Sequence, residues 1–150
     1  MPISKLQLFQ ECLRLANARV TRLEDEMKAL KDSAASDTKS SMGDKYETST
    51  EMMNLEKGKI AEQLGEASRM KQTLNSLDLD KVYIECQLGT LVVTENASYF
   101  LATSIGKVGV EGSDFFVISP ISPIGQQLLG KQVGDYINFG GKKVSIVKVE

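Results

Sequence analysis

The chain has 150 residues, of which 25% are charged and 41% hydrophobic, and its net charge is −2 at pH 7. This composition fits a soluble protein of one ordinary domain or two small ones, and it excludes a disordered chain. No apolar run approaches the length that crosses a bilayer, and the first residues do not form a signal peptide. A slightly negative chain lacks the usual electrostatic basis for binding duplex nucleic acid alone, so a partner or a local patch would have to deliver any such contact.

Histidine is absent, which excludes His-based acid–base catalysis, catalytic triads and His-ligated zinc. Cys12 and Cys86 stand far apart in apolar contexts and form no pair with metal-ligand spacing. We therefore expect two buried free thiols and a protein of the reducing cytoplasm.

A first helix is predicted from Ser4 to about residue 34. Ser4 and Gln7 have the spacing of a capping box, and neither proline nor glycine interrupts the segment. The apolar residues recur in steps of three and four, which is typical of a coiled-coil seam. They are Leu6, Phe9, Leu13, Ala16, Val20, Leu23, Met27 and Leu30.

A second helix is predicted from about Asp44 to Ser76. Gly58 and Gly65 weaken it by roughly 1 kcal/mol each relative to alanine, so it needs a partner helix. Its seam residues are Met53, Ile60, Leu64, Ala67, Leu74 and, less regularly, Met70. Because the linker is short, we expect an antiparallel hairpin within a monomer. A parallel homodimeric coiled coil is the alternative.

The polar stretch Ser33–Thr50 lies between the two patterns and contains Asp37, Asp44 and Glu47. In a hairpin these carboxylates would lie at the far tip. Asp37 is expected to be a turn residue or a helix N-cap. Asp44 and Glu47, three residues apart at a helix start, would share one face. Acids in a first turn can also simply stabilise the helix N-terminus, by about 0.3–1 kcal/mol each.

Residues 78–150 predict a second domain, a small α+β fold of five or six short strands and one helix, after a hairpin domain at 1–77. Strands are expected at 82–88, where apolar and polar residues alternate, and at 91–93, 99–103, 115–118, 136–139 and 142–149. Gly140–Gly141 is a hairpin signal between the last two. Ser122, Pro123 and Gly130 mark the cap, first position and end of a short helix.

The run from Ser122 to Lys131, followed by Val133, Gly134 and Asp135, resembles the C-terminal domain of the GreA/GreB transcript-cleavage factors. In that family a Ser-Pro-Ile/Leu-Gly/Ala-x-x-Leu-Leu/Ile-Gly-Lys/Arg run precedes a Gly-Asp pair and two final strands. The resemblance covers residues 78–150 by motif and residues 4–77 by architecture. It implies an antiparallel coiled coil followed by a domain similar to FK506-binding proteins.

The resemblance also implies a function in transcription elongation. In that family the globular domain docks on bacterial RNA polymerase at the mouth of the secondary channel, and the coiled coil enters the channel. Carboxylates at its tip help to hold the second Mg²⁺ of the polymerase active centre, which cleaves backtracked RNA. Such a protein is not itself an enzyme, holds no metal or cofactor of its own, and meets the nascent RNA only indirectly. The docking residues implied here are Ser122, Pro123, Ile124, Gly125 and Lys131.

The family's tip contains Gly-Asp-x-x-Glu, which Gly43, Asp44 and Glu47 match, so these two acids would assist catalysis. Mg²⁺ accepts one or two carboxylates together with water and phosphate oxygens. Tyr46 is an alternative match to the tyrosine after the family's acidic motif, in a register incompatible with the first.

Thr48, Ser49 and Thr50 stand where the family usually has an asparagine and a further glutamate. This departure leaves two functions open: stimulation of RNA cleavage, and channel binding without cleavage. A coiled-coil adaptor is a third candidate. An FKBP-like prolyl isomerase or chaperone is the last, with only Phe100, Phe115, Phe116, Phe139 and tyrosines to build its pocket.

Overall fold

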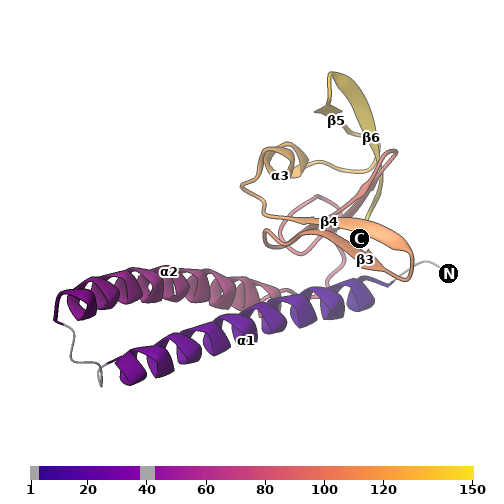
Figure 1. Cartoon of the computed structure of the whole chain (residues 1–150). Coiled ribbons are helices and arrows are strands. Elements are labelled where there is room, and N and C mark those ends of the chain that lie inside the picture. The colour runs from indigo at the N-terminus through magenta and orange to yellow at the C-terminus, as the bar shows by residue number, and fades with distance from the viewer. Residues whose placement is uncertain (1–3, 38–42) are drawn as a thin grey trace. The chain divides into compact units, whose positions relative to one another are not determined.

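The computed structural model describes the backbone of residues 4–37 and 43–150, and the side chains of residues 4–33 and 50–150. Two long helices come first, α1 (Lys5–Asp37) and α2 (Gly43–Asn75). A sheet domain follows, with one short helix, α3 (Pro123–Leu128), between its fourth and fifth strands (Figure 1). The strands are β1 (Leu91–Thr94), β2 (Ser98–Leu101), β3 (Gly106–Val110), β4 (Ser113–Ile118), β5 (Tyr136–Phe139) and β6 (Lys142–Val149). The predicted α+β class with an N-terminal helical hairpin is confirmed.

Packing divides the chain into two compact units. Leu15–Lys71 forms one, and the residues up to Arg14 join Gln72–Glu150 in the other. The first turns of α1 and the last turn of α2 therefore group with the sheet. The division into domains at 1–77 and 78–150 stays a prediction. Among the described residues, no helix combines the length and apolar character needed to cross a membrane.

In the hairpin unit, α1 and α2 run side by side in opposite directions (Figure 1). Leu23 of α1 is buried against Ile60 and Ala67 of α2. The half-buried residues around this cluster are Val20, Met27, Leu30 and Leu64. All seven were predicted seam residues. From Val20 onward, the predicted seam therefore packs α1 against α2 of the same chain.

The predicted seam is wrong by one position in the first turns of α1. Lys5, Leu8 and Cys12 are buried there, whereas Leu6 is 51% exposed and Phe9 and Leu13 are only half-buried. The change of stripe falls near Arg14, where α1 passes from one unit to the other. The helix start is as expected, since Ser4 Oγ accepts from Gln7 N at 3.1 Å and Gln7 Oε1 accepts from Ser4 N at 3.0 Å.

Residues 82–88 do not form the predicted strand, and the expected alternation of burial fails at Val82, Tyr83 and Ile84. Val82 and Ile84 are 87% and 72% exposed, while Tyr83 is 7% exposed. Tyr83 turns inward because its ring lies under the Lys5 ammonium, 4.4 Å from Nζ, and its hydroxyl donates to Asp78 O at 3.3 Å. Burial also lowers the pKa of Lys5, against the opposing effects of Glu150 and Asp78.

The strand order in the sheet is β3-β4-β2-β1-β6-β5, with β2 and β4 parallel and the other pairs antiparallel. One face packs on α3 through a cluster of buried residues: Cys86, Val92, Tyr99, Leu101, Leu128, Ile137, Val144 and Ile146. The alternate residues of β2 and β4, among them Phe100 and Val117, are buried on the other face. β5 and β3 are the two edge strands, and β5 is the one nearer α3 in sequence and in space (Figure 1).

Candidate functional site

The candidate tip acids lie at the start of the second helix. α2 begins at Gly43, so Asp44 and Glu47 occupy its first turns, where residues three apart share one face. Their side chains lie outside the described residues, so their predicted convergence is not tested. Tyr46 is also in this turn. Asp37 was predicted as a turn residue or helix N-cap, but it is the last residue of α1, because both helices extend into the polar stretch.

No group of three or more Cys, Asp or Glu side chains in the described part of the chain is arranged to hold a metal ion. Two carboxylates three residues apart would give a hydrated Mg²⁺ only a part of its shell. Whether Asp44 and Glu47 contribute to a metal site stays a prediction.

The Ser122–Lys131 segment is built by local hydrogen bonds. Ser122 is the N-cap of α3, where its Oγ accepts from Gly125 N at 3.1 Å, and Pro123 follows at the first helical position. The Ser122 hydroxyl also donates to Ser119 O at 2.6 Å. The cap and helix predicted from the sequence are confirmed, although α3 ends at Leu128 and is only six residues long.

Gly125 has a steric role. It is buried, and a Cβ at this position would lie 2.2 Å from Ser119 O and 2.8 Å from Ser122 Oγ. Ile124 is half-buried against the cluster under α3. Capping, core packing and close backbone packing therefore explain Ser122, Ile124 and Gly125, while Pro123 is exposed on the surface. Their predicted part in docking is untested.

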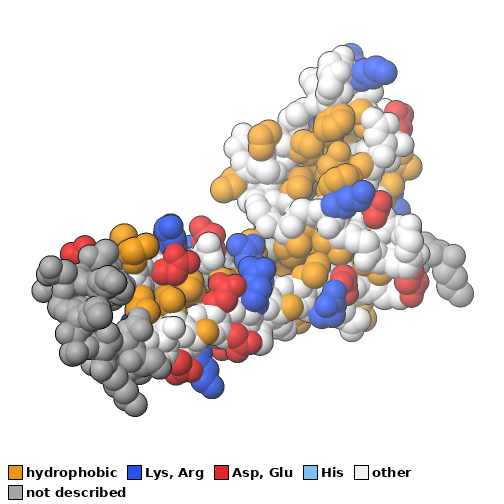
Figure 2. Space-filling view, in the orientation of Figure 1, with side chains coloured by type: hydrophobic (Ala, Val, Ile, Leu, Met, Phe, Trp, Pro, Cys, Tyr) orange, Lys and Arg blue, Asp and Glu red, His pale blue; other side chains and the backbone are white. Residues whose placement is uncertain are grey.

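After α3 the chain runs beside the loop that contains Cys86. Gly130 N donates to Cys86 O at 2.8 Å, and Cys86 N donates to Lys131 O at 2.8 Å. These two bonds fix the backbone at Lys131. Apolar side chains stand exposed on both sides of the junction, and they are Val82, Ile84, Leu88, Leu129 and Val133. Figure 2 shows hydrophobic side chains gathered on the visible face of the sheet domain.

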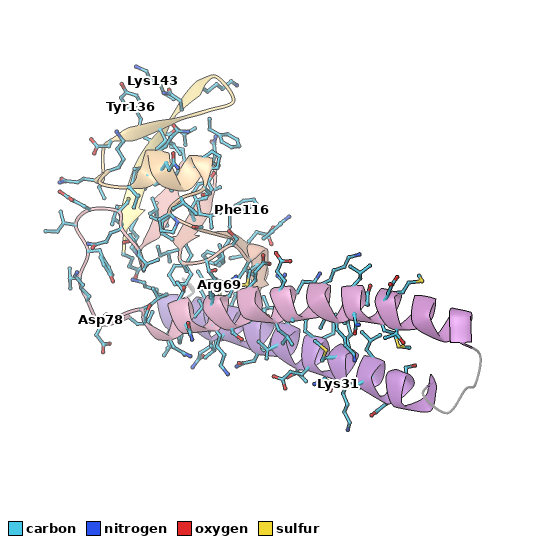
Figure 3. The ribbon with its side chains drawn as sticks, turned by 90° about the vertical axis from the view of Figure 1, so that its left-hand side faces the viewer. Lys31, Arg69, Asp78, Phe116, Tyr136 and Lys143 are labelled. Atoms are coloured by element: carbon cyan, nitrogen blue, oxygen red, sulfur yellow. The ribbon has the colours of Figure 1, made fainter. Side chains whose placement is uncertain are left out.

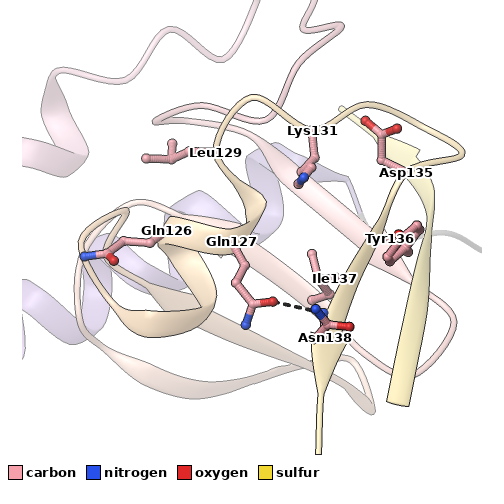
Figure 4. Close-up of a pocket in the computed structure, with 8 residues that line it drawn as sticks. All are labelled: Gln126, Gln127, Leu129, Lys131, Asp135, Tyr136, Ile137 and Asn138. Atoms are coloured by element: carbon pink, nitrogen blue, oxygen red, sulfur yellow. Dashed lines mark hydrogen bonds between the residues drawn. The ribbon is translucent and has the colours of Figure 1, made fainter. Parts of the chain in front are cut away.

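A groove between α3 and β5 was not predicted from the sequence. Its volume is about 510 Å³, and Gln126, Gln127, Leu129, Lys131, Asp135, Tyr136, Ile137 and Asn138 line it (Figure 4). Gln127 crosses the groove, and its Oε1 accepts from Asn138 N at 2.9 Å. Two signals for this groove were available in the sequence. They are the adjacent amides Gln126 and Gln127 in the short helix and the later hairpin signal at Gly140–Gly141.

The two cysteines are free and buried, as predicted. Burial raises the pKa of the Cys12 thiol to about 12 and that of the Cys86 thiol to about 11. Thiols held neutral in this way are poor nucleophiles and poor metal ligands at neutral pH. Neither cysteine is a candidate catalytic group.

No family model matches the chain, and no curated protein matches it. Among solved structures, it is similar to one described as the structure of the transcription factor Gfh1. The two are 18% identical, 93% of each chain is covered, and the TM-score is 0.39. This likeness is too distant to support an argument about function.

Proposed function

We propose that this protein regulates transcription in the cytoplasm by binding RNA polymerase, and that its hairpin presents Asp44 and Glu47 to the polymerase's catalytic metal. The observation that carries the proposal is the combination of two features in one chain. The Ser122–Lys131 motif resembles that of the transcript-cleavage factors, and the helical hairpin begins its second helix at Gly43.

The physical basis of the proposal is that a long helical hairpin can hold carboxylates far from the rest of the protein. α1 and α2 are each 33 residues long, and 33 residues of α-helix span about 50 Å at 1.5 Å per residue. Such a hairpin would carry two carboxylates far from its open end. Two-metal hydrolysis of a phosphodiester needs a second cation with oxygen ligands. The hairpin would supply two of these ligands, and the polymerase would supply the remaining chemistry.

The test uses stalled, backtracked elongation complexes and the full-length chain. Wild type is expected to shorten the RNA from its 3′ end. Asp44→Asn with Glu47→Gln should reduce this stimulation by about 10–100-fold, as loss of groups that support a metal does. Glu62→Gln with Glu66→Gln is the matched control, because these acids are exposed on the same helix in its other half. A tip variant as active as wild type would refute the role of the two acids.

Binding to polymerase is measured separately, by anisotropy of a dye-labelled chain. The second candidate function, channel binding without cleavage, is favoured by Thr48, Ser49 and Thr50 beside the tip. Binding without shortened RNA would support that function. Absence of binding would refute both.

A prolyl isomerase and a dimeric coiled-coil adaptor have less support from the structure. Phe100 and Phe115 are buried in the sheet, and Phe116 and Phe139 belong to strands separated by β2, β1 and β6. The four rings therefore form no common pocket of the kind a prolyl isomerase would need. The seam residues that a dimeric adaptor would pair between chains are packed between α1 and α2.

A further inference from the structure

In the part of the chain that the structure describes, strand β5 has a neighbouring strand on one side only. It pairs with β6, in the register Tyr136↔Ser145, Ile137↔Val144, Asn138↔Lys143 and Phe139↔Lys142. Its other edge faces the α3 groove, and such an edge is a template for a further strand.

The hydrogen bond from Asn138 N to Gln127 Oε1 shows which groups point into the groove. In an antiparallel pair, successive residues direct their N–H and C=O groups alternately toward and away from the partner strand. Because Asn138 N points away from β6, its carbonyl and both backbone groups of Tyr136 lie on the same outer edge. Gln127 Oε1 occupies the place that a carbonyl of a neighbouring strand would take.

The groove has room for an added segment. Its volume is about 510 Å³, and most of its lining side chains are polar (Figure 4). Leu129, which is 43% exposed, offers an apolar contact, whereas Ile137 is only 2% exposed. A peptide of a few residues could therefore lie along β5 and place a side chain against Leu129.

The charged side chains at the groove and its hairpin have a different balance from the whole chain, whose net charge is −2. Lys131 lines the groove, and Lys142 and Lys143 lie across from β5 on β6. Figure 2 shows basic side chains at the end of the β5–β6 hairpin. The acid in the lining, Asp135, is engaged in a turn, where its Oδ2 accepts from Gln132 N at 2.8 Å.

We propose that the α3–β5 groove binds an extended, acidic segment of a partner protein, which pairs with the outer edge of β5 as an added strand. Carbonyls of the segment would replace Gln127 Oε1 at Asn138 N, and its carboxylates would meet Lys131 and Lys143. This proposal does not depend on the polymerase proposal.

A single-stranded nucleic acid fits the site less well. Such ligands need aromatic rings on which successive bases stack. Lys143 Nζ already covers the Tyr136 ring, 4.5 Å from its centroid (Figure 3). Successive strand residues point to alternate faces of the sheet, so Phe139, three positions after Tyr136, lies on the opposite face of β5. The two exposed rings therefore form no continuous platform.

The test is a titration of the isotope-labelled full-length chain, followed by amide NMR shifts. The probe is a capped seven-residue peptide that alternates glutamate and valine. Shifts are expected at the backbone amides of Tyr136 and Asn138 and at the side-chain amide of Gln127, with a dissociation constant of about 0.1–1 mM. A peptide with lysine in place of glutamate should bind at least about 10-fold more weakly. A glutamate peptide with N-methylated backbone amides should not bind, because it lacks strand donors.

Two variants separate the backbone from the charge contribution. Asn138→Pro removes only the outward donor, so binding should be lost while pairing with β6 remains. Lys142→Glu with Lys143→Glu should weaken acidic-peptide binding by about 10-fold or more. Lys59→Glu with Lys71→Glu, on exposed positions of α2, changes the net charge equally and should leave binding unchanged.

Several results would overturn the proposal. They are equal binding of the lysine and glutamate peptides, retained binding of the N-methylated peptide, or shifts that avoid β5. Binding of oligouridylate at these amides, without binding of the acidic peptide, would assign the groove to nucleic acid instead. If Asn138→Pro does not fold, the N-methylated peptide and the charge-reversal pair still decide.

Discussion

Replacement of Leu8 by alanine tests whether α1 packs on the sheet domain through the stripe that the structure shows. Leu8 is 0% exposed, and Phe9, the seam residue predicted from sequence periodicity, is only half-buried. Leu8→Ala removes three buried carbons, or about 2.4 kcal/mol at 0.8 kcal/mol per group. The cavity left behind adds to this, so the free energy of unfolding should fall by about 3–4 kcal/mol.

Phe9→Ala should cost less, about 1–2 kcal/mol, because a half-buried ring loses less contact and leaves an open space that water can fill. Leu6→Ala is the surface control, since Leu6 is 51% exposed, and should change stability by about 0.5 kcal/mol or less. Urea unfolding of the full-length chain gives these values, with tyrosine fluorescence reporting on the sheet domain through Tyr83 and Tyr99. A larger loss from Phe9→Ala than from Leu8→Ala would refute the observed register and favour the one predicted from the heptads.

Three further predictions concern stability. Gly58→Ala in α2 should raise the free energy of unfolding by about 1 kcal/mol in urea titrations, because its Cβ would meet nothing within 4 Å and helix propensity improves. Glu111→Asn, at φ 49° in the β3–β4 turn, should raise it by about 0.5–1 kcal/mol by the same assay, since asparagine tolerates the left-handed conformation better. Cys12 and Cys86 have pKa values raised to about 12 and about 11 from the usual 9. The neutral thiols contribute to folding stability below pH 9, and this contribution is lost as pH rises toward these values. The urea midpoint of the wild type should therefore fall above pH 9. In the double variant Cys12→Ala with Cys86→Ala it should fall less steeply.

The hairpin was predictable because its signals are local and periodic. From Val20 onward the seam depends only on the helix period and on a partner with a similar stripe, and α2 supplies one. The same period fails before Arg14 because α1 there meets a sheet, which the heptad pattern does not encode. Lys5 illustrates this, since a lysine that is 8% exposed finds its place through Glu150 O and the Tyr83 ring, both far away in sequence.

Two predictions about the sheet are wrong: one predicted strand does not form, and one strand was missed. The alternation at 82–88 predicts a strand, but these residues pair with no strand of the described sheet, and Tyr83 turns inward in place of Val82 and Ile84. Conversely, β3 was missed because Gly106 and Gly109 give it low strand propensity. It forms because β4 offers a free edge and because Glu111 and Gly112 adopt the positive φ values of a tight hairpin turn. Pairing partners decided both cases, and neither partner is visible in a local window.

The Ser122–Lys131 segment separates residues that build the fold from residues that are free to contact a partner. Ser122 and Gly125 are accounted for by the cap and by close packing of the backbone, so their substitution would disturb α3 whatever the segment binds. Ile121, 80% exposed, and Lys131 have no comparable structural role for their side chains. Loss of polymerase binding after Ile121→Ala or Lys131→Ala would therefore be evidence of contact, whereas the same loss after Gly125→Ala would not. The docking role of the segment stays a prediction, and substitutions of its exposed side chains are the ones that can test it.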